Sequence, residues 1–183
     1  MNNSKLETLA AKEQARQEKF KRRIFCCTST ACLSAGAGLA HTTIKQGVAA
    51  HKGDPHEAEV VPTGCMGLCS HSPLVRVDAK EEDSILYGDV SATVAQQIVT
   101  RHLPLEESVE ELEADEMEEG VAPHDFLHFR ASRRKVEAKA GLEKNIISLD
   151  LPFFRKQVKV VLSETGQINP ESLEDYLAHG GYK

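Results

Sequence analysis

The sequence lacks the features that mark several other classes of protein. It has no Trp and only 5% aromatic residues, so a core must be built mainly from Val, Ile, Leu and Ala. Its formal net charge is -6, without the general basic character that nucleic-acid binding needs. No run approaches the roughly 18 consecutive apolar residues of a membrane span, and residues 1–23 contain no apolar signal-peptide core. We therefore expect a cytoplasmic protein with no nucleic-acid partner and no direct membrane insertion.

Motifs for hydrolysis and phosphoryl transfer are also missing. The sequence contains no G-x-S-x-G, P-loop or H-E-x-x-H motif, and no glycine-rich loop that could hold a flavin phosphate. We therefore expect no catalytic residues and no enzymatic active site in this chain taken alone.

The five cysteines are the strongest chemical signal. In an intracellular protein such a group indicates metal binding rather than disulfides. Cys27 and Cys32 form a C-x4-C pair after a predicted strand, and Cys65 and Cys69 form a C-x3-C pair after another. Four thiolates could hold a 2Fe-2S cluster or one zinc ion. We favour iron and sulfur, because the first pair opens a long predicted helix whereas zinc knuckles usually lie on short hairpins, and because neither pair has the C-x-x-C spacing of redox-active thiols. A structural zinc site and redox-active thiols stay open as alternatives.

Small residues next to these cysteines fit a metal centre. Gly64 and Gly67 would let backbone N–H groups approach the sulfur atoms, and residues 28–30 add small polar side chains. Cys26 falls outside both pairs, and we interpret it as a small apolar strand residue. His71 follows Cys69 by two residues. It is either a surface histidine or a neighbour that makes the reduction potential depend on pH.

The hydrophobic pattern predicts an α/β fold in residues 23–103, preceded by a helix in the segment 1–22. That first helix is expected over residues 4–22, with Ser4 and Glu7 as a capping box. The expected order after it is β-α-β-β-β-α. The strands are predicted at 24–27, 59–61, 74–77 and 85–87, the last two as a hairpin, and the helices at 34–51 and 92–102. The first of these helices has an apolar face of Ala37, Ala40, Ile44 and Val48, and Ser91 can cap the second.

The rest of the chain divides into two segments. Residues 104–149 begin with nine acids between Glu106 and Glu119, which predicts an acidic linker followed by a mixed-charge helix. Residues 150–183 predict a short βα unit, with a strand at 158–162 and a helix that starts at Asn169-Pro170 and stops at Gly180-Gly181. One strand and one helix cannot bury a core alone.

The cysteine region resembles a known family. The stretch CTSTACLSAG from Cys27, the stretch TGCMGLCSHSPLVRVD around Cys65 and Cys69, and the later ILYGDV resemble the thioredoxin-like 2Fe-2S ferredoxins. This resemblance covers about residues 23–103. It implies a thioredoxin-like fold and electron transfer through one 2Fe-2S cluster, in which Cys27 and Cys32 hold one iron and Cys65 and Cys69 hold the other.

The end of the chain resembles a different family. PFFRKQVKVVLSETGQINPESLEDYLAHGGYK is similar to the start of the NADH-binding flavoprotein subunit of respiratory complex I. A ferredoxin-like domain ahead of that start resembles the diaphorase flavoprotein subunit of NAD-reducing hydrogenases and related formate dehydrogenases. The resemblance implies an amino-terminal fragment of an NAD(P)H-dependent oxidoreductase. FMN, NAD and a 4Fe-4S cluster are then expected only in the missing part, and redox partner subunits as partners.

Overall fold

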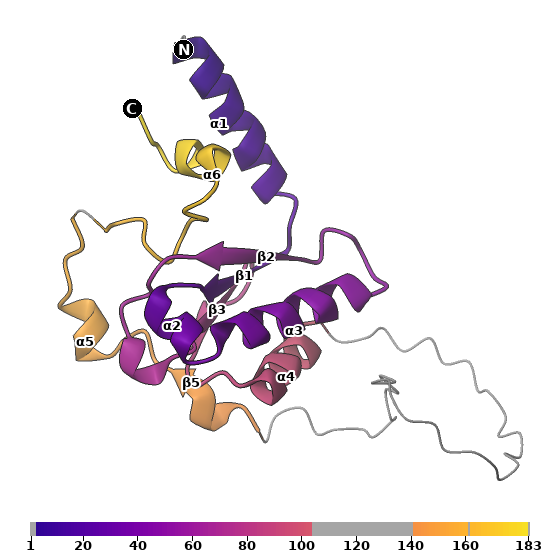
Figure 1. Ribbon diagram of the computed structural model, residues 1–183. Coiled ribbons are helices and arrows are strands. Elements are labelled where there is room, and N and C mark those ends of the chain that lie inside the picture. Colours follow the sequence, from indigo (N-terminus) through magenta and orange to yellow (C-terminus); the bar gives the residue numbers. More distant parts are fainter. Residues whose placement is uncertain (1–2, 104–140, 161, 183) are drawn as a thin grey trace, which may run out of the picture.

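The computed structural model describes residues 3–103, 141–160 and 162–182 (Figure 1). Of the acidic linker and mixed-charge helix expected over residues 104–149, residues 104–140 lie outside the described residues, and residues 141–149 contain a 3-10 turn and a short strand that were not predicted. No helix in the described part is long and apolar enough to cross a membrane. The helices are α1 (Asn3–Gln17), α2 (Thr30–Ser34), α3 (Ala37–Ala50), α4 (Ala92–His102), α5 (Pro152–Arg155) and α6 (Leu173–Ala178), with single 3-10 turns η1 (Cys69–His71) and η2 (Glu143–Asn145).

A mixed β-sheet forms the centre of the fold and confirms the predicted α/β class. Its strands are β1 (Arg22–Cys27), β2 (Ala58–Thr63), β3 (Val75–Ala79), β4 (Ile85–Tyr87) and β5 (Ile146–Ile147). Their order in the sheet is β2-β1-β3-β4-β5. β1 and β2 are parallel, because the connection through α2 and α3 returns the chain to the same end of the sheet. The other neighbours are antiparallel, including the predicted hairpin of β3 and β4.

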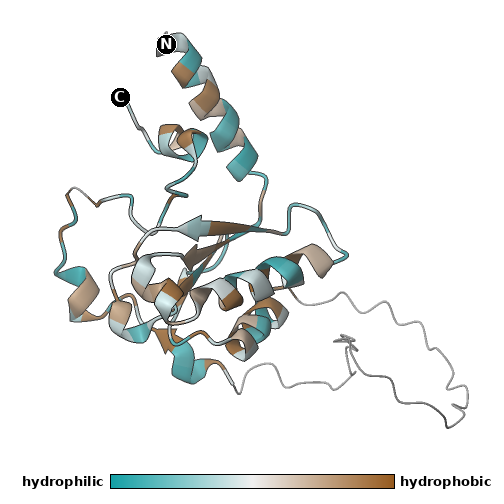
Figure 2. Cartoon of the chain, in the orientation of Figure 1, coloured by the Kyte–Doolittle hydropathy of each residue, from teal (hydrophilic) through white to brown (hydrophobic). Residues whose placement is uncertain are grey.

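One face of the sheet is covered by α3 and α4. Ile24 and Val77 from the strands pack there with Ile44 of α3 and Ile98 of α4, and all four are buried. The capping prediction for α4 is confirmed, because the Ser91 hydroxyl accepts a hydrogen bond from the Val94 N–H. Figure 2 shows the central strands as largely hydrophobic, as this burial requires. Because side chains alternate along a strand, every second residue of these strands points toward α3 and α4.

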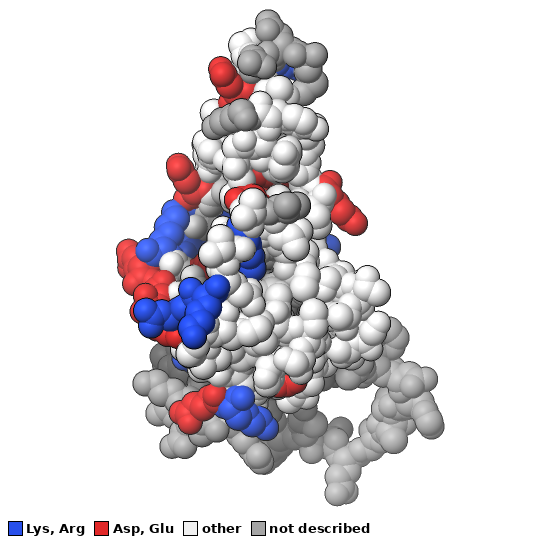
Figure 3. All heavy atoms as spheres, turned by 90° about the vertical axis from the view of Figure 1, so that its left-hand side faces the viewer, with Lys and Arg blue, Asp and Glu red and all other residues white. Residues whose placement is uncertain are grey.

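The opposite face carries a second cluster centred on Phe25, Val61 and Leu86. The guanidinium groups of Arg23 and Arg76 lie 5.0 and 4.6 Å from the centroid of the Phe25 ring. Phe154 of α5 packs against the cluster, so the C-terminal segment covers part of this face. Most exposed large hydrophobic side chains of the described residues also belong to that segment. From the α5 side, charged side chains gather toward one edge and leave a broad uncharged surface (Figure 3).

The helix predicted over residues 34–51 is observed as α3, but it begins later than predicted because a separate short helix precedes it. α2 ends at Ser34 and α3 begins at Ala37, with Gly36 between them at a φ of 97°. That left-handed conformation cannot continue a right-handed helix, and glycine adopts it at little cost. The predicted apolar face of the second helix is confirmed, since Ala40 and Ile44 are buried.

The C-terminal segment packs back onto the N-terminal helix. α1 and α6 lie side by side at one end of the molecule (Figure 1). The Gln14 side-chain amide donates to the Ala178 carbonyl at 2.6 Å, and that of Gln17 donates to Asp175 Oδ1 at 2.7 Å. Asp175 is buried, and Arg23 Nη2 lies 3.9 Å from its Oδ2. Polar pairing therefore holds the two chain ends together.

Three details of the two ends differ from the predictions. α1 begins at Asn3 and ends at Gln17, short of the predicted end at residue 22, so Ser4 lies inside the helix, where its carbonyl accepts from the Thr8 hydroxyl. Residues 158–160 and 162 form no strand, since no strand pairs with them, and Val158 is 87% exposed. The last helix is capped by Ser172, which accepts from the Asp175 N–H.

The stop signal of that last helix is confirmed. Gly180 has a φ of 92°, and the Gly181 N–H returns to the Tyr176 carbonyl at 3.0 Å. This is a Schellman ending, in which glycine adopts the left-handed conformation just after the helix.

Candidate metal centre

The four candidate ligands lie at one end of the sheet. Cys27 is the last residue of β1 and pairs in register with Thr63, the last residue of β2. Because the two strands are parallel, their carboxyl ends meet at the same edge, and the loop after each carries a cysteine pair. The Thr28 N–H donates to the Thr63 carbonyl at 2.9 Å and continues the pairing one residue beyond the strand.

The first pair is buried. Cys27 and Cys32 are 1% and 0% exposed, and both belong to the cluster on the Phe25 face of the sheet. The short helix α2 turns Cys32 back toward the strand end, which the break at Gly36 permits. The Ser29 hydroxyl lies 3.2 Å from Cys27 Sγ, so a residue of the predicted polar stretch 28–30 does contact a sulfur atom.

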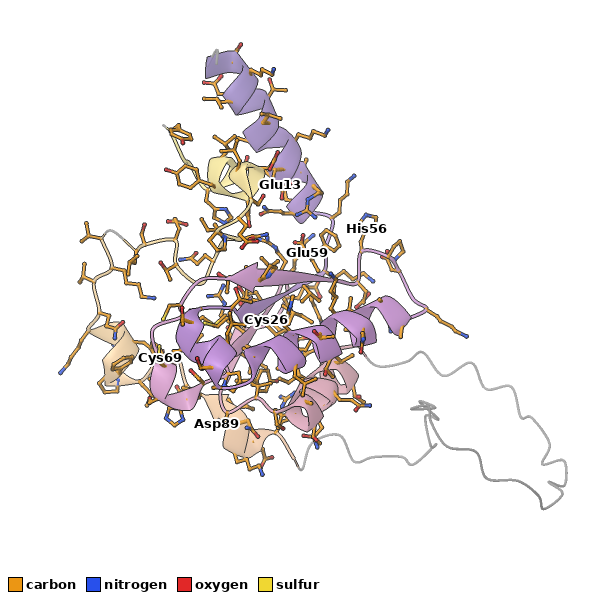
Figure 4. The ribbon with its side chains drawn as sticks, viewed as in Figure 1. Glu13, Cys26, His56, Glu59, Cys69 and Asp89 are labelled. Atoms are coloured by element: carbon orange, nitrogen blue, oxygen red, sulfur yellow. The ribbon has the colours of Figure 1, made fainter. Side chains whose placement is uncertain are left out.

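The second pair is more exposed. Cys65 is half-buried, Cys69 is exposed, and their sulfur atoms are 3.6 Å apart. Gly67 lies between them with a φ of 91°, and its N–H points to Cys65 Sγ at 3.4 Å. The predicted role of glycine in bringing an N–H to sulfur is thus observed at Gly67. Figure 4 shows Cys69 at the turn η1, away from the centre of the domain.

Ser72 links the two pairs and was not anticipated from the sequence. Its hydroxyl oxygen lies 3.2 Å from Cys32 Sγ and also donates to the Cys69 carbonyl at 2.8 Å. The only sequence signal is its position three residues after Cys69, in a stretch where any polar residue would look like ordinary loop. Ser72 therefore fixes the η1 turn against the buried pair.

The environment separates the pKa values of the two thiols of the first pair. Burial acts to raise the pKa of Cys27, but the Ser29 hydroxyl and N–H outweigh it and hold the pKa below its usual value. Burial, with the adjacent Cys27, raises the pKa of Cys32. The hydrogen bond with Cys65 raises the pKa of Cys69. Ionisation of the first pair is thus favoured at Cys27, the state in which a thiol binds a metal.

The donor set fits a two-iron cluster. Two thiolates on one tetrahedral ion, with metal–sulfur bonds of about 2.3 Å, lie roughly 3.8 Å apart. The 3.6 Å between Cys65 and Cys69 agrees with that separation. The thiols are arranged as two pairs, and a 2Fe-2S cluster uses two thiolates on each iron.

Cys26 and His71 lie beside this site in different ways. Cys26 is 2% exposed, and its side chain packs in the cluster beneath α3 and α4, which agrees with its interpretation as an apolar strand residue. His71 is exposed at the end of η1, and its Nδ1 lies 3.1 Å from Asp89 Oδ2. Its effect on the reduction potential stays a prediction.

Comparison with known proteins matches a family to this part of the chain. Residues 13–102 match the family model for thioredoxin-like 2Fe-2S ferredoxins. A solved structure of such a ferredoxin from Aquifex aeolicus has 25% sequence identity, covers 51% of this chain and 89% of that one, and gives a TM-score of 0.41. The wild-type structure of the same ferredoxin has 26% identity, covers 51% and 95%, and gives a TM-score of 0.39. The family match is confined to residues 13–102, the part of the chain that contains both cysteine pairs.

Proposed function

Because residues 13–102 match the family model for thioredoxin-like 2Fe-2S ferredoxins, we propose that this chain is an electron-transfer module. Its cluster is held by Cys27 and Cys32 on one iron and by Cys65 and Cys69 on the other. The observation that carries the proposal is the placement of two thiol pairs at the carboxyl ends of adjacent parallel strands. The 2Fe-2S group supplies one-electron redox chemistry when it is bound.

The residues around the proposed cluster have different roles. The buried pair, Cys27 and Cys32, anchors one side within the core and excludes water from it. Cys69 lies at the surface, so electrons enter and leave on that side, where a partner can approach. The Gly67 N–H points to Cys65 Sγ and the Ser29 hydroxyl lies against Cys27 Sγ. Hydrogen bonds of this kind stabilise negative charge on sulfur and help to set the potential. The Ser72 hydroxyl donates its proton to the Cys69 carbonyl and holds the η1 turn beside Cys32.

The test uses anaerobically purified protein. Iron, acid-labile sulfide and zinc are counted, and absorbance and low-temperature EPR are recorded before and after dithionite. We expect about two irons and two sulfides per chain and a rhombic signal only after reduction, as for a 2Fe-2S cluster. One zinc per chain without a redox signal would replace the proposal with a structural zinc site.

Cysteine variants locate the ligands. Cys65→Ser should lose or shift the EPR signal of the reduced cluster. Cys26→Ser is the matched control, because the Cys26 thiol lies on the face of the sheet opposite Cys27 and Cys32. An equal loss in both variants would count against the proposed ligand set. A structural zinc site would instead show unfolding of Cys65→Ser with no redox signal to lose.

We further propose that the module works at the amino-terminal end of an NAD(P)H dehydrogenase or diaphorase flavoprotein subunit, in a hydrogenase-like or complex I-like assembly. The support is the resemblance of residues 152–183 to the start of that subunit. In such an assembly FMN, NAD and a 4Fe-4S cluster belong to the remaining part, and redox subunits donate and accept the electron.

Stopped-flow absorbance tests this placement. NADH alone should leave the cluster oxidised, since the described residues provide no nucleotide-binding loop. NADH together with a purified FMN-containing NADH dehydrogenase flavoprotein should reduce it. Lack of reduction in the second mixture would remove the support for this assembly while leaving the electron-transfer function intact.

A further inference from the structure

The C-terminal segment approaches the metal centre after α5. Residues 157–160 and 162–168, here called the strap, run along the loop that carries Cys65 and Cys69. The Thr63 hydroxyl, buried at the end of β2, donates to the Ile168 carbonyl at 2.8 Å. A Cβ placed on Gly64 would lie 3.6 Å from the Thr165 methyl group. The strap is therefore fastened immediately before the second cysteine pair.

The contact continues on both sides of Cys65. A Cβ on Gly166 would lie 3.3 Å from Cγ of Met66, which is itself buried. A Cβ on Gly67 would lie 3.9 Å from both Gln157 Oε1 and Lys159 Nζ. Two polar side chains of the strap thus converge on the glycine whose N–H points to Cys65 Sγ.

Residues 157–160 of the strap are all exposed, and their side chains alternate between the cysteine loop and the solvent. Gln157 and Lys159 reach the cysteine loop, while Val158 and Val160 are 87% and 80% exposed. Burial of the two valines would be favoured by about 1.5–3 kcal/mol each if the segment only had to cover the core. The polar side chains of this stretch, although exposed to solvent, lie on the side of the cysteine loop, so the strap brings a side-chain amide and a positive charge close to Gly67.

We infer that the strap is part of the metal centre, where it closes over the Cys65–Cys69 loop and places the Lys159 ammonium group beside it. The closure of the strap over the loop concerns the protein alone, whereas the effect of the Lys159 charge rests on the proposed function. A cluster held by four thiolates gains one negative charge when it takes up one electron from a donor. A nearby cation stabilises that extra charge and raises the reduction potential.

The closure is tested in the cluster-free protein by the rate of alkylation with iodoacetamide, followed peptide by peptide at low conversion. Thr63→Val removes the hydroxyl that fastens the strap, and Thr43→Val on the exposed face of α3 is its matched control. We expect Cys65 to react about fivefold faster in Thr63→Val relative to the exposed Cys69, as the loss of one buried hydrogen bond predicts.

A second variant acts within the strap and spares the sheet. Gly166→Val meets Met66 and strains a backbone with a φ of 85°, so it should lift the strap and accelerate the reaction of Cys65. Unchanged Cys65 rates in both variants, each shown by circular dichroism to be folded, would overturn the closure.

The charge is tested by the reduction potential of the loaded protein. Lys159→Gln should lower the potential, whereas Lys156→Gln removes an equal charge from the end of α5 and should lower it less. Equal shifts in the two variants, or no shift in Lys159→Gln, would refute the role of Lys159. A protein that binds no iron would refute the proposed function, and the alkylation rates would still decide the closure.

Discussion

The thiols of Cys26 and Cys27 belong to adjacent residues of β1 but lie on opposite faces of the sheet. Cys26 packs beneath α3 and α4, and Cys27 lies with Cys32 on the face that contains Phe25. This follows from the two-residue period of a strand, which sends neighbouring side chains in opposite directions. Burial raises the pKa of Cys26 to about 12, so its thiol stays protonated at neutral pH. Of the two, only Cys27 is directed to the metal centre.

Replacing Cys26 should therefore lower the stability of the protein but leave its iron content unchanged. We expect Cys26→Ala to keep the iron content of the wild type and to lose about 1 kcal/mol in the free energy of unfolding, because a small buried group is removed. Cys27→Ala should lose the cluster. Iron analysis and urea unfolding of both variants check this. If Cys26→Ala emptied the site, the assignment of Cys27 as the ligand would have to be abandoned.

Gly36 sets the turn between α2 and α3 through its backbone alone. Its φ is 97°, and a Cβ there would meet no atom within 4 Å. Gly36→Ala should cost about 1–2 kcal/mol in unfolding free energy, since only the left-handed conformation opposes it. Gly38→Ala in the first turn of α3, where a Cβ also meets no atom within 4 Å, should stabilise the protein by about 0.5 kcal/mol. Thermal unfolding of the pair measures the contrast, and equal effects would contradict it.

Local signals in the sequence predicted most of the sheet and its flanking helices. Alternating or continuous apolar residues mark β1, β3 and β4, and Ser91 marks the start of α4, because burial and capping act within a few residues. The cysteine spacing likewise predicted two thiol pairs at neighbouring strand ends. These features depend only on residues that are close together in the sequence.

Features that depend on distant contacts could not be predicted. β5 has only two residues, too few for any periodicity, and it is held by Asn145, whose side-chain amide donates to the Gly88 carbonyl at 2.8 Å. The expected strand at 158–162 has the right composition but no partner strand. Ser72 and Lys159 reach the site through the folding of loops, so their residue types alone carry no signal.

Asp175 holds α6 against α1, and its replacement should release that helix. Its two oxygens accept hydrogen bonds from the Gln17 amide and the Asn169 N–H. Burial acts to raise the pKa of Asp175, but hydrogen bonds from His179, the Asn169 N–H and Gln17 outweigh it and lower the pKa. Asp175→Ala leaves these donors without their acceptor, at a cost of about 2–3 kcal/mol.

Amide hydrogen exchange measures this loss of stability separately for α6 and for the rest of the domain. The amides of residues 173–178 should exchange up to roughly 100-fold faster in Asp175→Ala, while those of β1 stay protected. Glu174→Ala removes an exposed acid from the same turn and is the matched control. Uniform acceleration across β1 and α6 would show global destabilisation in place of local undocking.

His102 makes the stability of the domain depend on pH. It is 5% exposed, and its Nε2 lies 2.9 Å from the Tyr87 hydroxyl. Burial, aided by the charges of Arg101 and Arg22 and slightly opposed by Glu82, lowers its pKa to about 4 from the ordinary 6.5. Above pH 6.5 the imidazole is neutral in both folded and unfolded chains. Between pH 6.5 and 4 the unfolded chain binds a proton that the folded chain does not, so stability falls as the pH falls.

The size of this loss follows from the two pKa values. Between pH 7 and pH 5 it amounts to about 2 kcal/mol in the free energy of unfolding. His102→Gln keeps an acceptor for the Tyr87 hydroxyl but does not titrate, so it should lose about 2 kcal/mol less than the wild type over the same interval. Urea unfolding measures the free energy of unfolding of both proteins at the two pH values. The contributions of all other titrating groups are the same in both proteins and cancel in the difference. Parallel losses would mean that His102 takes up its proton in the folded protein as readily as in the unfolded chain, and that Tyr87 and the core tolerate the charge.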